Sequence, residues 1–122
     1  MLSNLFSSIS NNNNLFKSYL IVPNKKKYIR IINLLFQEGL IRRYKVSSNE
    51  IYIFLKYKNN KPLIKKIKLI SSPKRRQFIK LKEVQKLPFD KIYIISTSKG
   101  VYTNFAAQKI NLGGELICSI QI

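Results

Sequence analysis

Residues 92–100 read Ile-Tyr-Ile-Ile-Ser-Thr-Ser-Lys-Gly, and this stretch decides the fold of the C-terminal part of the chain. Four apolar or aromatic residues followed by hydroxyl residues and a glycine are typical of a buried strand that ends in a surface loop. Thr103 can then cap a short helix over residues 104–110. Gly113-Gly114 allows a sharp turn into a second apolar strand over residues 115–120, because glycine tolerates positive φ. The two strand ends and their loops are therefore predicted to form one presented surface.

The polar groups of this surface suit RNA. The hydroxyl groups of Ser96, Thr97 and Ser98 can donate and accept hydrogen bonds without adding charge. With Lys99 beside them, they match phosphate oxygens, ribose hydroxyls and base edges. Glu115 is the last acid in the chain, and its lone carboxylate could accept a hydrogen bond from a ribose hydroxyl or an exocyclic amine. The alternative is an ordinary polar hairpin end with a surface glutamate.

Residues 94–118 resemble the C-terminal signature of the universal small-subunit ribosomal protein eight. The shared pattern is Ser-Thr-Ser-Lys-Gly-Val-Tyr-Thr, then paired alanines, then Leu-Gly-Gly-Glu-Leu-Ile-Cys. The order of elements fits that family over the whole chain. In the family's pattern a tyrosine is usual where Phe78 stands, and an aspartate is common at Asn104. The resemblance implies a two-domain protein that binds the central domain of small-subunit ribosomal RNA early in assembly, together with neighbouring ribosomal proteins.

The charge of the chain also points to a polyanion. The 122 residues include 23 basic and 5 acidic ones, which gives a net charge of +18. The length allows one domain or two small ones, and a hydrophobic fraction of 45% is ordinary for a globular protein. So much charge on so few residues would repel itself in the folded state unless a polyanion were bound. Nucleic acid is therefore the leading predicted partner, and an anionic membrane surface is the second.

Composition argues against metal sites, disulfides and most catalytic chemistry. The chain has no histidine and a single cysteine, Cys118, which lies in an apolar strand and is predicted to be an unreactive core thiol. Ser96 and Lys99 have the spacing of a serine–lysine dyad, but Gly100 interrupts the helix that such a dyad requires. No run approaches the roughly 20 apolar residues of a membrane span. We expect no enzyme activity, cofactor, metal, small-molecule substrate or membrane span.

The N-terminal part predicts the order helix, strand, helix, strand, strand. An amphipathic helix over residues 2–10 is followed by a flexible loop at the asparagine tract 11–14 and a strand over 15–22. Strands over 40–46 and 50–57 form a hairpin. This order predicts a small α+β domain with its helices packed on one face of the sheet.

The second helix of this domain carries an unusual first turn. Asn24 is predicted as its N-cap and Gly39 as its stop, and its buried stripe consists of Tyr28, Ile31, Ile32 and Leu35. The first turn holds Lys25, Lys26 and Lys27, at the positive end of the helix dipole, where each costs a few tenths of a kcal/mol, up to about 1. Contact with a phosphate backbone would explain them, and a merely solvated basic turn is the alternative.

A domain boundary is predicted at Ser71-Ser72-Pro73, because proline breaks a strand ladder and the pattern changes after it. It separates an N-terminal α+β domain, residues 1–72, from an RNA-binding domain, residues 73–122, which is mainly antiparallel β with one short helix. Lys74-Arg75-Arg76 then places cations beside Phe78, which suits phosphate pairing and base stacking. An edge strand protected by charge is the alternative.

These observations predict a structural constituent of the small ribosomal subunit that supports subunit assembly and translation. The alternative is a basic protein that binds RNA or anionic membranes without a specific ribosomal RNA site. Close backbone approach is expected at the glycines of the presented surface. The predicted RNA-binding residues are Ser96, Thr97, Ser98, Lys99, Gly100, Thr103, Gly113, Gly114, Glu115, Arg75, Arg76, Phe78, Lys25, Lys26 and Lys27.

The composition also bears on the compartment. Abundant Ile, Lys, Asn and Tyr with only four glycines indicate an AT-rich gene, which suggests an organelle-encoded protein. A mitochondrion is favoured over a plastid, because plastid relatives keep more of the family's Arg-Pro-Gly pattern.

Overall fold

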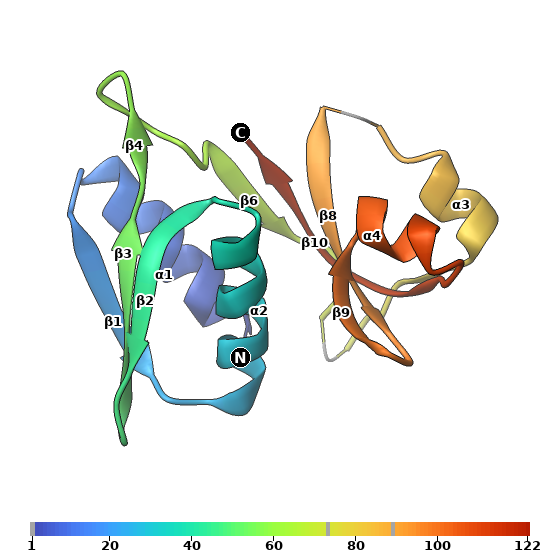
Figure 1. Cartoon of the computed structure of the whole chain (residues 1–122), viewed down its shortest axis with the longest axis horizontal. Coiled ribbons are helices and arrows are strands. Elements are labelled where there is room, and N and C mark those ends of the chain that lie inside the picture. The colour runs from blue at the N-terminus through green and yellow to red at the C-terminus, as the bar shows by residue number, and fades with distance from the viewer. Residues whose placement is uncertain (1, 73, 89) are drawn as a thin grey trace. The chain divides into compact units, whose positions relative to one another are not determined.

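The computed structural model describes residues 2–72, 74–88 and 90–122. By its internal contacts the chain divides into two compact units, Met1–Lys65 and Lys66–Ile122 (Figure 1). The sequence places a boundary later, after Ser72. Strand β6 (Lys66–Leu69) nevertheless belongs with the second unit, because it pairs with that unit's strand β10 (Gly114–Gln121).

The first unit is a three-stranded antiparallel sheet with two helices. Its elements are α1 (Leu2–Asn14), β1 (Tyr19–Pro23), α2 (Lys26–Gln37), β2 (Ile41–Val46) and β3 (Glu50–Leu55), with strand order β1-β3-β2. Both helices lie on the same face of the sheet (Figure 1). The short strands β4 (Tyr57–Lys58) and β5 (Lys61–Pro62) form a separate pair. The predicted α+β class and the predicted order of elements are confirmed.

The core of this unit lies between the helices and the covered face of the sheet. All four residues of the predicted α2 stripe are buried, and β3 alternates buried residues with partly exposed ones. The side chains that fill this core are Leu5, Phe6, Ile9, Leu20, Val22, Tyr28, Ile31, Ile32, Leu35, Ile51, Ile53 and Leu55.

The asparagine tract is helical rather than a flexible loop, so α1 continues to Asn14. The amide of Asn12 donates to the carbonyl of Ser8 at 2.7 Å, and the amide of Asn13 donates to the carbonyl of Ile64 at 3.4 Å. These bonds satisfy side chains that would otherwise compete with the helix backbone. The helix ends before Phe16, which has a φ of 55°, and the following strand begins only at Tyr19.

The start of α2 differs from the prediction in one respect. Lys25, not Asn24, occupies the N-cap position, and it forms no side-chain cap. Asn24 instead donates from its side-chain amide to the carbonyl of Ser47 at 2.7 Å, which ties the helix entry to the β2–β3 turn. The helix ends as predicted before Gly39, whose φ is +73°.

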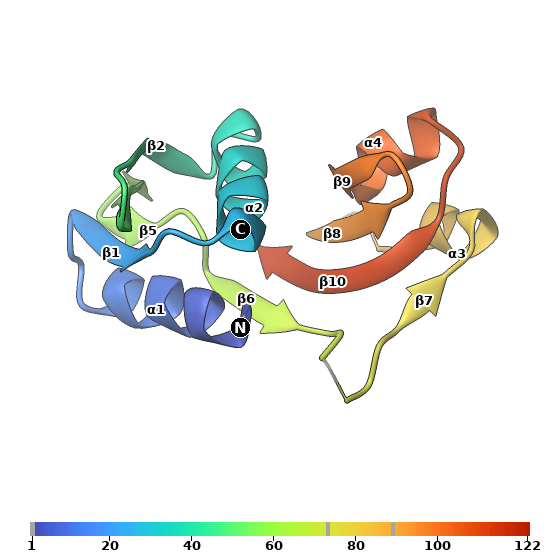
Figure 2. The ribbon, with the colours of Figure 1, turned by 90° about the horizontal axis from the view of Figure 1, so that it is seen from below.

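The second unit is built around β10. Its elements after β6 are β7 (Phe78–Ile79), α3 (Leu81–Gln85), β8 (Lys91–Thr97), β9 (Gly100–Thr103), α4 (Asn104–Lys109) and β10. The sheet order is β6-β10-β8-β9, all antiparallel, and β7 also pairs with β10. Figure 2 shows β10 running first along β7 and then along β6. The sequence predicts one short helix here, α4, and the structure adds α3, in which the backbone N–H of Lys80 donates to the Glu83 carboxylate at 3.2 Å.

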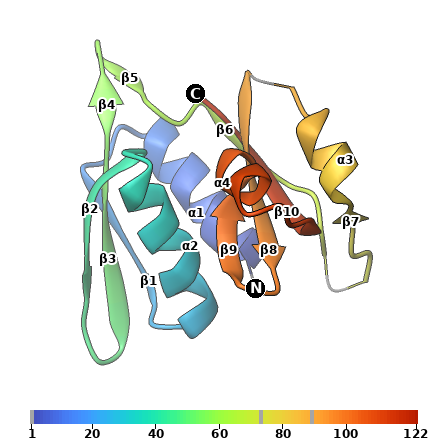
Figure 3. The same ribbon diagram turned by 45° about the vertical axis from the view of Figure 1, so that its right-hand side comes forward.

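Helices α3 and α4 close the core of this unit. Figure 3 shows α4 following β9, next to β8. The core cluster consists of Val84 from α3, Ala107 from α4, and Tyr93, Ile95 and Leu116 from the sheet. Thr103 caps α4 as predicted, because its hydroxyl oxygen accepts from the backbone N–H of Ala106 at 3.2 Å.

Candidate nucleic-acid interface

The β8–β9 hairpin presents a two-residue turn, Ser98-Lys99, between the paired residues Thr97 and Gly100. The Thr97 hydroxyl is used inside this turn: it donates to the carbonyl of Gly100 at 2.8 Å and accepts from the N–H of Lys99 at 3.2 Å. Ser98 and Lys99 are exposed, and the Ser98 hydroxyl makes no hydrogen bond to any described residue. Of the expected row of hydroxyls, Thr97 therefore shapes the turn while Ser98 faces outward.

Gly100 is required by its backbone conformation. Its φ of +134° is one that residues with a side chain rarely adopt. A Cβ there would be in ordinary van der Waals contact with the Tyr102 ring, whose nearest carbon is 3.7 Å away, so the cost of a substitution comes from the backbone conformation and not from overlap.

Gly113 and Gly114 have a different requirement from the one expected. Neither has a positive φ, and the left-handed residue of this turn is Asn111, with a φ of 57°. A Cβ on Gly113 would overlap the carbonyl oxygen of Ile79, and a Cβ on Gly114 would overlap the carbonyl oxygen of Ser96. The close backbone approach predicted at these glycines is thus made by the chain itself, where β10 enters between β7 and β8.

Three predicted residues lie in one row across the sheet. Glu115 is paired with Ser96 of β8 on one side and with Phe78 of β7 on the other. The Phe78 side chain is 68% exposed, which is unusual for a large aromatic group. An exposed ring, a carboxylate and a hydroxyl are therefore held at neighbouring positions by strand pairing.

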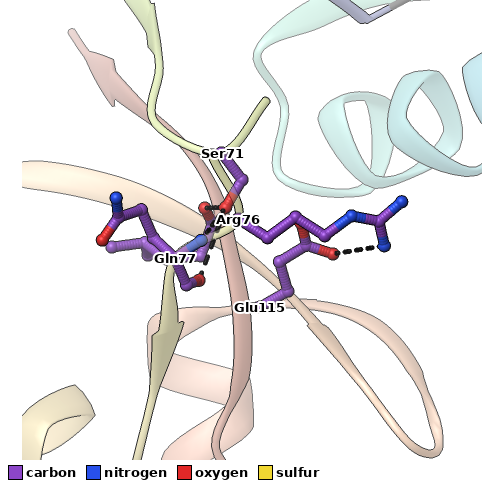
Figure 4. A network of polar contacts seen from close by, with 5 residues as sticks. Ser71, Arg76, Gln77 and Glu115 are labelled. Atoms are coloured by element: carbon purple, nitrogen blue, oxygen red, sulfur yellow. Dashed lines mark hydrogen bonds and ion pairs between the residues drawn. The ribbon is translucent and has the colours of Figure 1, made fainter. Parts of the chain in front are cut away.

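Glu115 is not a lone carboxylate. The Arg76 guanidinium lies 4.0 Å from its Oε1 atom, as Figure 4 shows, and the Arg76 side chain is 60% exposed against 19% for Glu115. An exposed pair of this kind contributes about 0–1 kcal/mol to stability. It leaves the guanidinium beside Glu115 and mostly exposed, so that it can also pair with phosphate oxygens.

Ser71 anchors the basic loop, a role that the sequence does not indicate. Its hydroxyl, in a side chain only 7% exposed, donates to the carbonyl of Leu116 at 2.7 Å and accepts from the N–H of Gln77 at 2.9 Å (Figure 4). The N–H of Leu116 in turn donates to the carbonyl of Gln77 at 2.8 Å. The segment that carries Arg75 and Arg76 is thereby fixed against β10. In the sequence Ser71 is typical of a turn. Its anchoring role cannot be recognised there, because its partner Leu116 lies far along the chain.

Two polar residues at the start of α4 are buried. Thr103 is 2% exposed with its hydroxyl engaged in the cap, so it does not lie on the presented surface. Asn104 is 1% exposed, and its Oδ1 atom accepts from the N–H of Tyr93 at 3.1 Å. Asn104 therefore holds α4 against β8. The sequence does not indicate this role, although position 104 belongs to the pattern described above, in which an aspartate is common.

The remaining predicted contacts are exposed cations. Lys74, Arg75 and Arg76 lie in the loop before β7, whereas Lys25, Lys26 and Lys27 lie at the start of α2 in the first unit. The Lys25 ammonium is 5.4 Å from the centre of the Tyr28 ring, a cation–π contact that helps to hold it there. These basic residues therefore belong to two separate units.

Other chemistry finds little support in the described residues. Cys118 is fully buried, and burial raises the pKa of its thiol to about 12, so it stays protonated at neutral pH. Among residues 2–72, 74–88 and 90–122, no three His, Cys, Asp or Glu side chains are grouped so as to hold a metal ion. Within the same residues, no helix is both long and apolar enough to cross a membrane.

An exposed aromatic ring, a hydroxyl and a carboxylate held at paired strand positions, with Arg76 beside the carboxylate, are typical of a nucleic-acid-binding protein when they occur in a small basic α+β protein. The model of the family Ribosomal protein S8 matches residues 1–121. The chain belongs to the ribosomal protein S8 family. It is thus a structural, non-enzymatic protein of the small ribosomal subunit, in a family that binds small-subunit ribosomal RNA and neighbouring ribosomal proteins.

Curated relatives match over both units. A small ribosomal subunit protein uS8 from Baumannia cicadellinicola is 37% identical, covering 98% of this chain and 95% of the relative. A small ribosomal subunit protein uS8m from Acanthamoeba castellanii is 36% identical, covering 98% of each chain. A protein uS8 from Dictyoglomus thermophilum is 38% identical over 81% of this chain and 79% of the relative.

Proposed function

We propose that this chain recognises the central domain of small-subunit ribosomal RNA through the row Phe78, Glu115 and Ser96 and the hairpin turn Ser98-Lys99. The observation that carries the proposal is the register of β10, which places Glu115 opposite Phe78 on one side and Ser96 on the other. Strand pairing fixes the spacing of these groups before RNA arrives, so little ordering entropy opposes binding.

Each group has a distinct role in this proposal. Phe78 offers an exposed ring on which an unpaired base can stack, which contributes about 1–3 kcal/mol. Ser98 can donate to or accept from a ribose hydroxyl or a base edge, and Glu115 can accept from an exocyclic amine. Arg75 and Arg76 neutralise phosphates beside them.

An irregular RNA helix with bulged bases is the target that suits this surface. Regular A-form RNA hides its base edges in a deep major groove, while its shallow minor groove presents 2′-hydroxyls. A hydroxyl-bearing turn can enter that minor groove, and an exposed ring needs a base that has left the stack. The lysines at the start of α2 add a salt-dependent contribution that is blind to sequence.

A basic protein without a specific ribosomal RNA site is the competing interpretation. Charge alone explains attraction to polyanions, but it requires no fixed row of uncharged hydrogen-bonding groups. The internal use of Thr97 and Ser71 to shape the turn and the basic loop favours a surface built for one geometry.

The test is a salt titration of binding to the central-domain ribosomal RNA fragment, with a scrambled duplex of equal length as competitor. We expect a preference for the native fragment that survives at moderate salt and falls in Ser98→Ala, by about 1–3 kcal/mol, without a change in salt slope. Ser48→Ala is the matched control, because Ser48 is also an exposed turn serine but lies between β2 and β3. Equal binding to both RNAs, lost together as salt rises, would leave only a polyanion binder.

We further infer that the chain works in a mitochondrial ribosome. Two observations support this assignment. The amino-acid composition indicates an AT-rich gene. The Acanthamoeba castellanii relative carries the name uS8m, which marks a mitochondrial protein. Bacterial relatives are equally similar, so the compartment is tested directly. An antibody to this chain should follow small ribosomal subunits in a gradient of purified mitochondria; enrichment in plastid or cytosolic particles would overturn the assignment.

A further inference from the structure

The uncovered face of the first unit's sheet carries two ordered rows of side chains. Strand register places Tyr19 of β1 beside Phe54 of β3, and Phe54 beside Arg43 of β2. The next row consists of Ile21, Tyr52 and Lys45 in the same strand order. Their neighbours along each strand, such as Leu20, Ile53 and Leu55, are buried beneath the helices, so these six side chains point away from the core.

The aromatic rings on this face touch one another. The ring centres of Tyr19 and Phe54 are 5.8 Å apart at 36°, and those of Tyr19 and Tyr52 are 6.4 Å apart at 33°. On the other side of Phe54, the Arg43 guanidinium carbon lies 4.4 Å from the ring centre. Three rings and a guanidinium therefore form a continuous platform across the sheet.

This platform is accessible and carries positive charge. Tyr19 is 46% exposed and Ile21 is 45% exposed. Arg43 and Lys45 of β2 are also exposed. Residues 1–65 contain 12 basic residues and two acids, Glu38 and Glu50. By strand alternation Glu50 shares this face, but it stands at its end, opposite Pro23, beyond the row of Tyr52.

We propose that this platform, defined by Tyr19, Ile21, Arg43, Lys45, Tyr52 and Phe54, is a second binding site that takes unpaired RNA. Aromatic side chains and guanidinium planes on an open antiparallel sheet face stack splayed bases, and adjacent cations neutralise their phosphates. The site goes beyond the interface of the second unit, because it recognises single strands and lies in a different compact unit.

Charge and ring content decide between RNA and other occupants. A second copy of this chain would bring the same cations against Arg43 and Lys45, and like charges would oppose that contact. A protein partner would have to place carboxylates against Arg43 and Lys45, whereas every nucleotide of an RNA strand brings a phosphate together with a base that can stack on the three rings. Cations placed beside stacked rings match a strand of bases with a phosphate on every nucleotide.

The experiment is a titration of the full, isotope-labelled chain with an unstructured oligouridylate of about eight nucleotides, a length within the usual range for a stacking site. Backbone amide signals report where the RNA binds. We expect the largest shifts in β1, β2 and β3, and a smaller response to a perfect duplex of equal length. Tyr19→Leu and Tyr52→Leu should each weaken binding about tenfold without changing its salt dependence, since they remove a ring but no charge. Lys45→Gln should instead lower the salt slope by about one unit.

Phe36→Leu is the matched control, because Phe36 is 44% exposed in the same unit but lies on α2. Its binding should equal that of the unsubstituted chain, and the amide spectrum of every variant checks its fold. Shifts confined to residues 66–122, or equal shifts with duplex and single strand, would overturn the proposal. Shifts that grow with protein concentration without RNA would assign the face to a second copy instead. Failure of the Ser98→Ala test with the central-domain fragment concerns the other unit and leaves this result independent.

Discussion

Replacing Gly114 by alanine should destabilise the second unit through overlap of main-chain atoms. The added Cβ would meet the carbonyl oxygen of Ser96, and it would also lie 2.9 Å from the Ser96 carbonyl carbon and 3.2 Å from the Thr97 Cα atom. All three atoms belong to the backbone of β8, so no side chain can rotate away. Strand β8 is itself paired with β9 on its other edge, which limits its retreat.

The size of the effect follows from what must move. Overpacking in a tight interior costs about 1–3 kcal/mol. Separating β10 from β8 near Ser96 also weakens one or two ladder hydrogen bonds, each of which contributes about 0.5–1.5 kcal/mol. Partial relief of the overlap means that the two costs do not add fully, so we expect the free energy of opening this unit to fall by about 2–3 kcal/mol.

Cys118 provides a direct assay of this opening. It is the only cysteine of the chain, lies in β10 and is fully buried, so a thiol reagent reaches it only when the unit opens. At about tenfold per 1.4 kcal/mol, Gly114→Ala should speed labelling by about 30- to 150-fold. Labelling within about twofold of the unsubstituted chain would refute the overlap argument, since it corresponds to less than about 0.5 kcal/mol.

Gly39→Ala is the matched control in the first unit. Gly39 has a φ of +73°, and a Cβ there would meet only the flexible end of Lys56 in ordinary contact, with Nζ at 3.9 Å. Its cost is backbone strain of about 1–2 kcal/mol, without overlap. It should lower the thermal stability of the first unit and leave the labelling of Cys118 nearly unchanged.

Four further predictions concern single residues. Phe78→Ala should weaken binding to the central-domain RNA about tenfold at every salt concentration, because it removes a stacking ring but no charge. It should change the free energy of unfolding in urea by less than about 0.5 kcal/mol, because Phe78 is 68% exposed. A large loss of stability would assign the ring to the core. Asn104→Ala should cost about 1–3 kcal/mol in urea unfolding, since it strands the buried N–H of Tyr93, whereas Asn104→Asp keeps an acceptor and should cost less; equal losses would contradict this. Burial raises the pKa of the Cys118 thiol from 9.0 to about 12, so the contribution of this thiol to stability is complete below pH 9 and declines as pH rises toward 12. Stability measured by urea unfolding should therefore decline less steeply between pH 9 and 11 in Cys118→Ala than in the unsubstituted chain. Identical slopes would refute the burial argument. Lys26→Ala should lower the salt slope of RNA binding by about one unit without altering the preference for the native fragment, and an unchanged slope would mean a solvated turn.

Periodicity made much of the fold predictable. The helical spacing of Tyr28, Ile31, Ile32 and Leu35 and the alternation along β3 report burial directly, so α2 and its sheet follow from sequence. Thr103 is predictable as a cap because capping is decided within one turn. The helical asparagine tract is not, because Asn13 finds its partner, the carbonyl of Ile64, far along the chain.

The candidate sites divide in the same way. Neighbouring strands β8 and β10 bring Ser96 and Glu115 together, and the two apolar runs with polar ends indicate a shared surface in advance, although not the exact pairing. The place of Phe78 beside Glu115 could not be predicted, because β7 has only two residues and shows no period. The platform of the first unit could not be predicted either. Tyr52 and Phe54 alternate with apolar residues, so both faces of β3 look apolar in the sequence, and only the register with Tyr19 and Arg43 shows that the rings and cations are neighbours.

The position of β10 has a consequence for the order of synthesis. This strand pairs with β6, β7 and β8, yet it follows all of them in the sequence. During translation, the sheet of the second unit cannot close until residue 121 has left the exit tunnel, whereas the first unit has its last sheet strand by Leu55. The first unit can therefore fold on the nascent chain. Strands β6, β7 and β8 each keep an unpaired edge until β10 has been synthesised. RNA already bound to the first unit would keep the incompletely folded second unit close to the RNA that it is proposed to recognise.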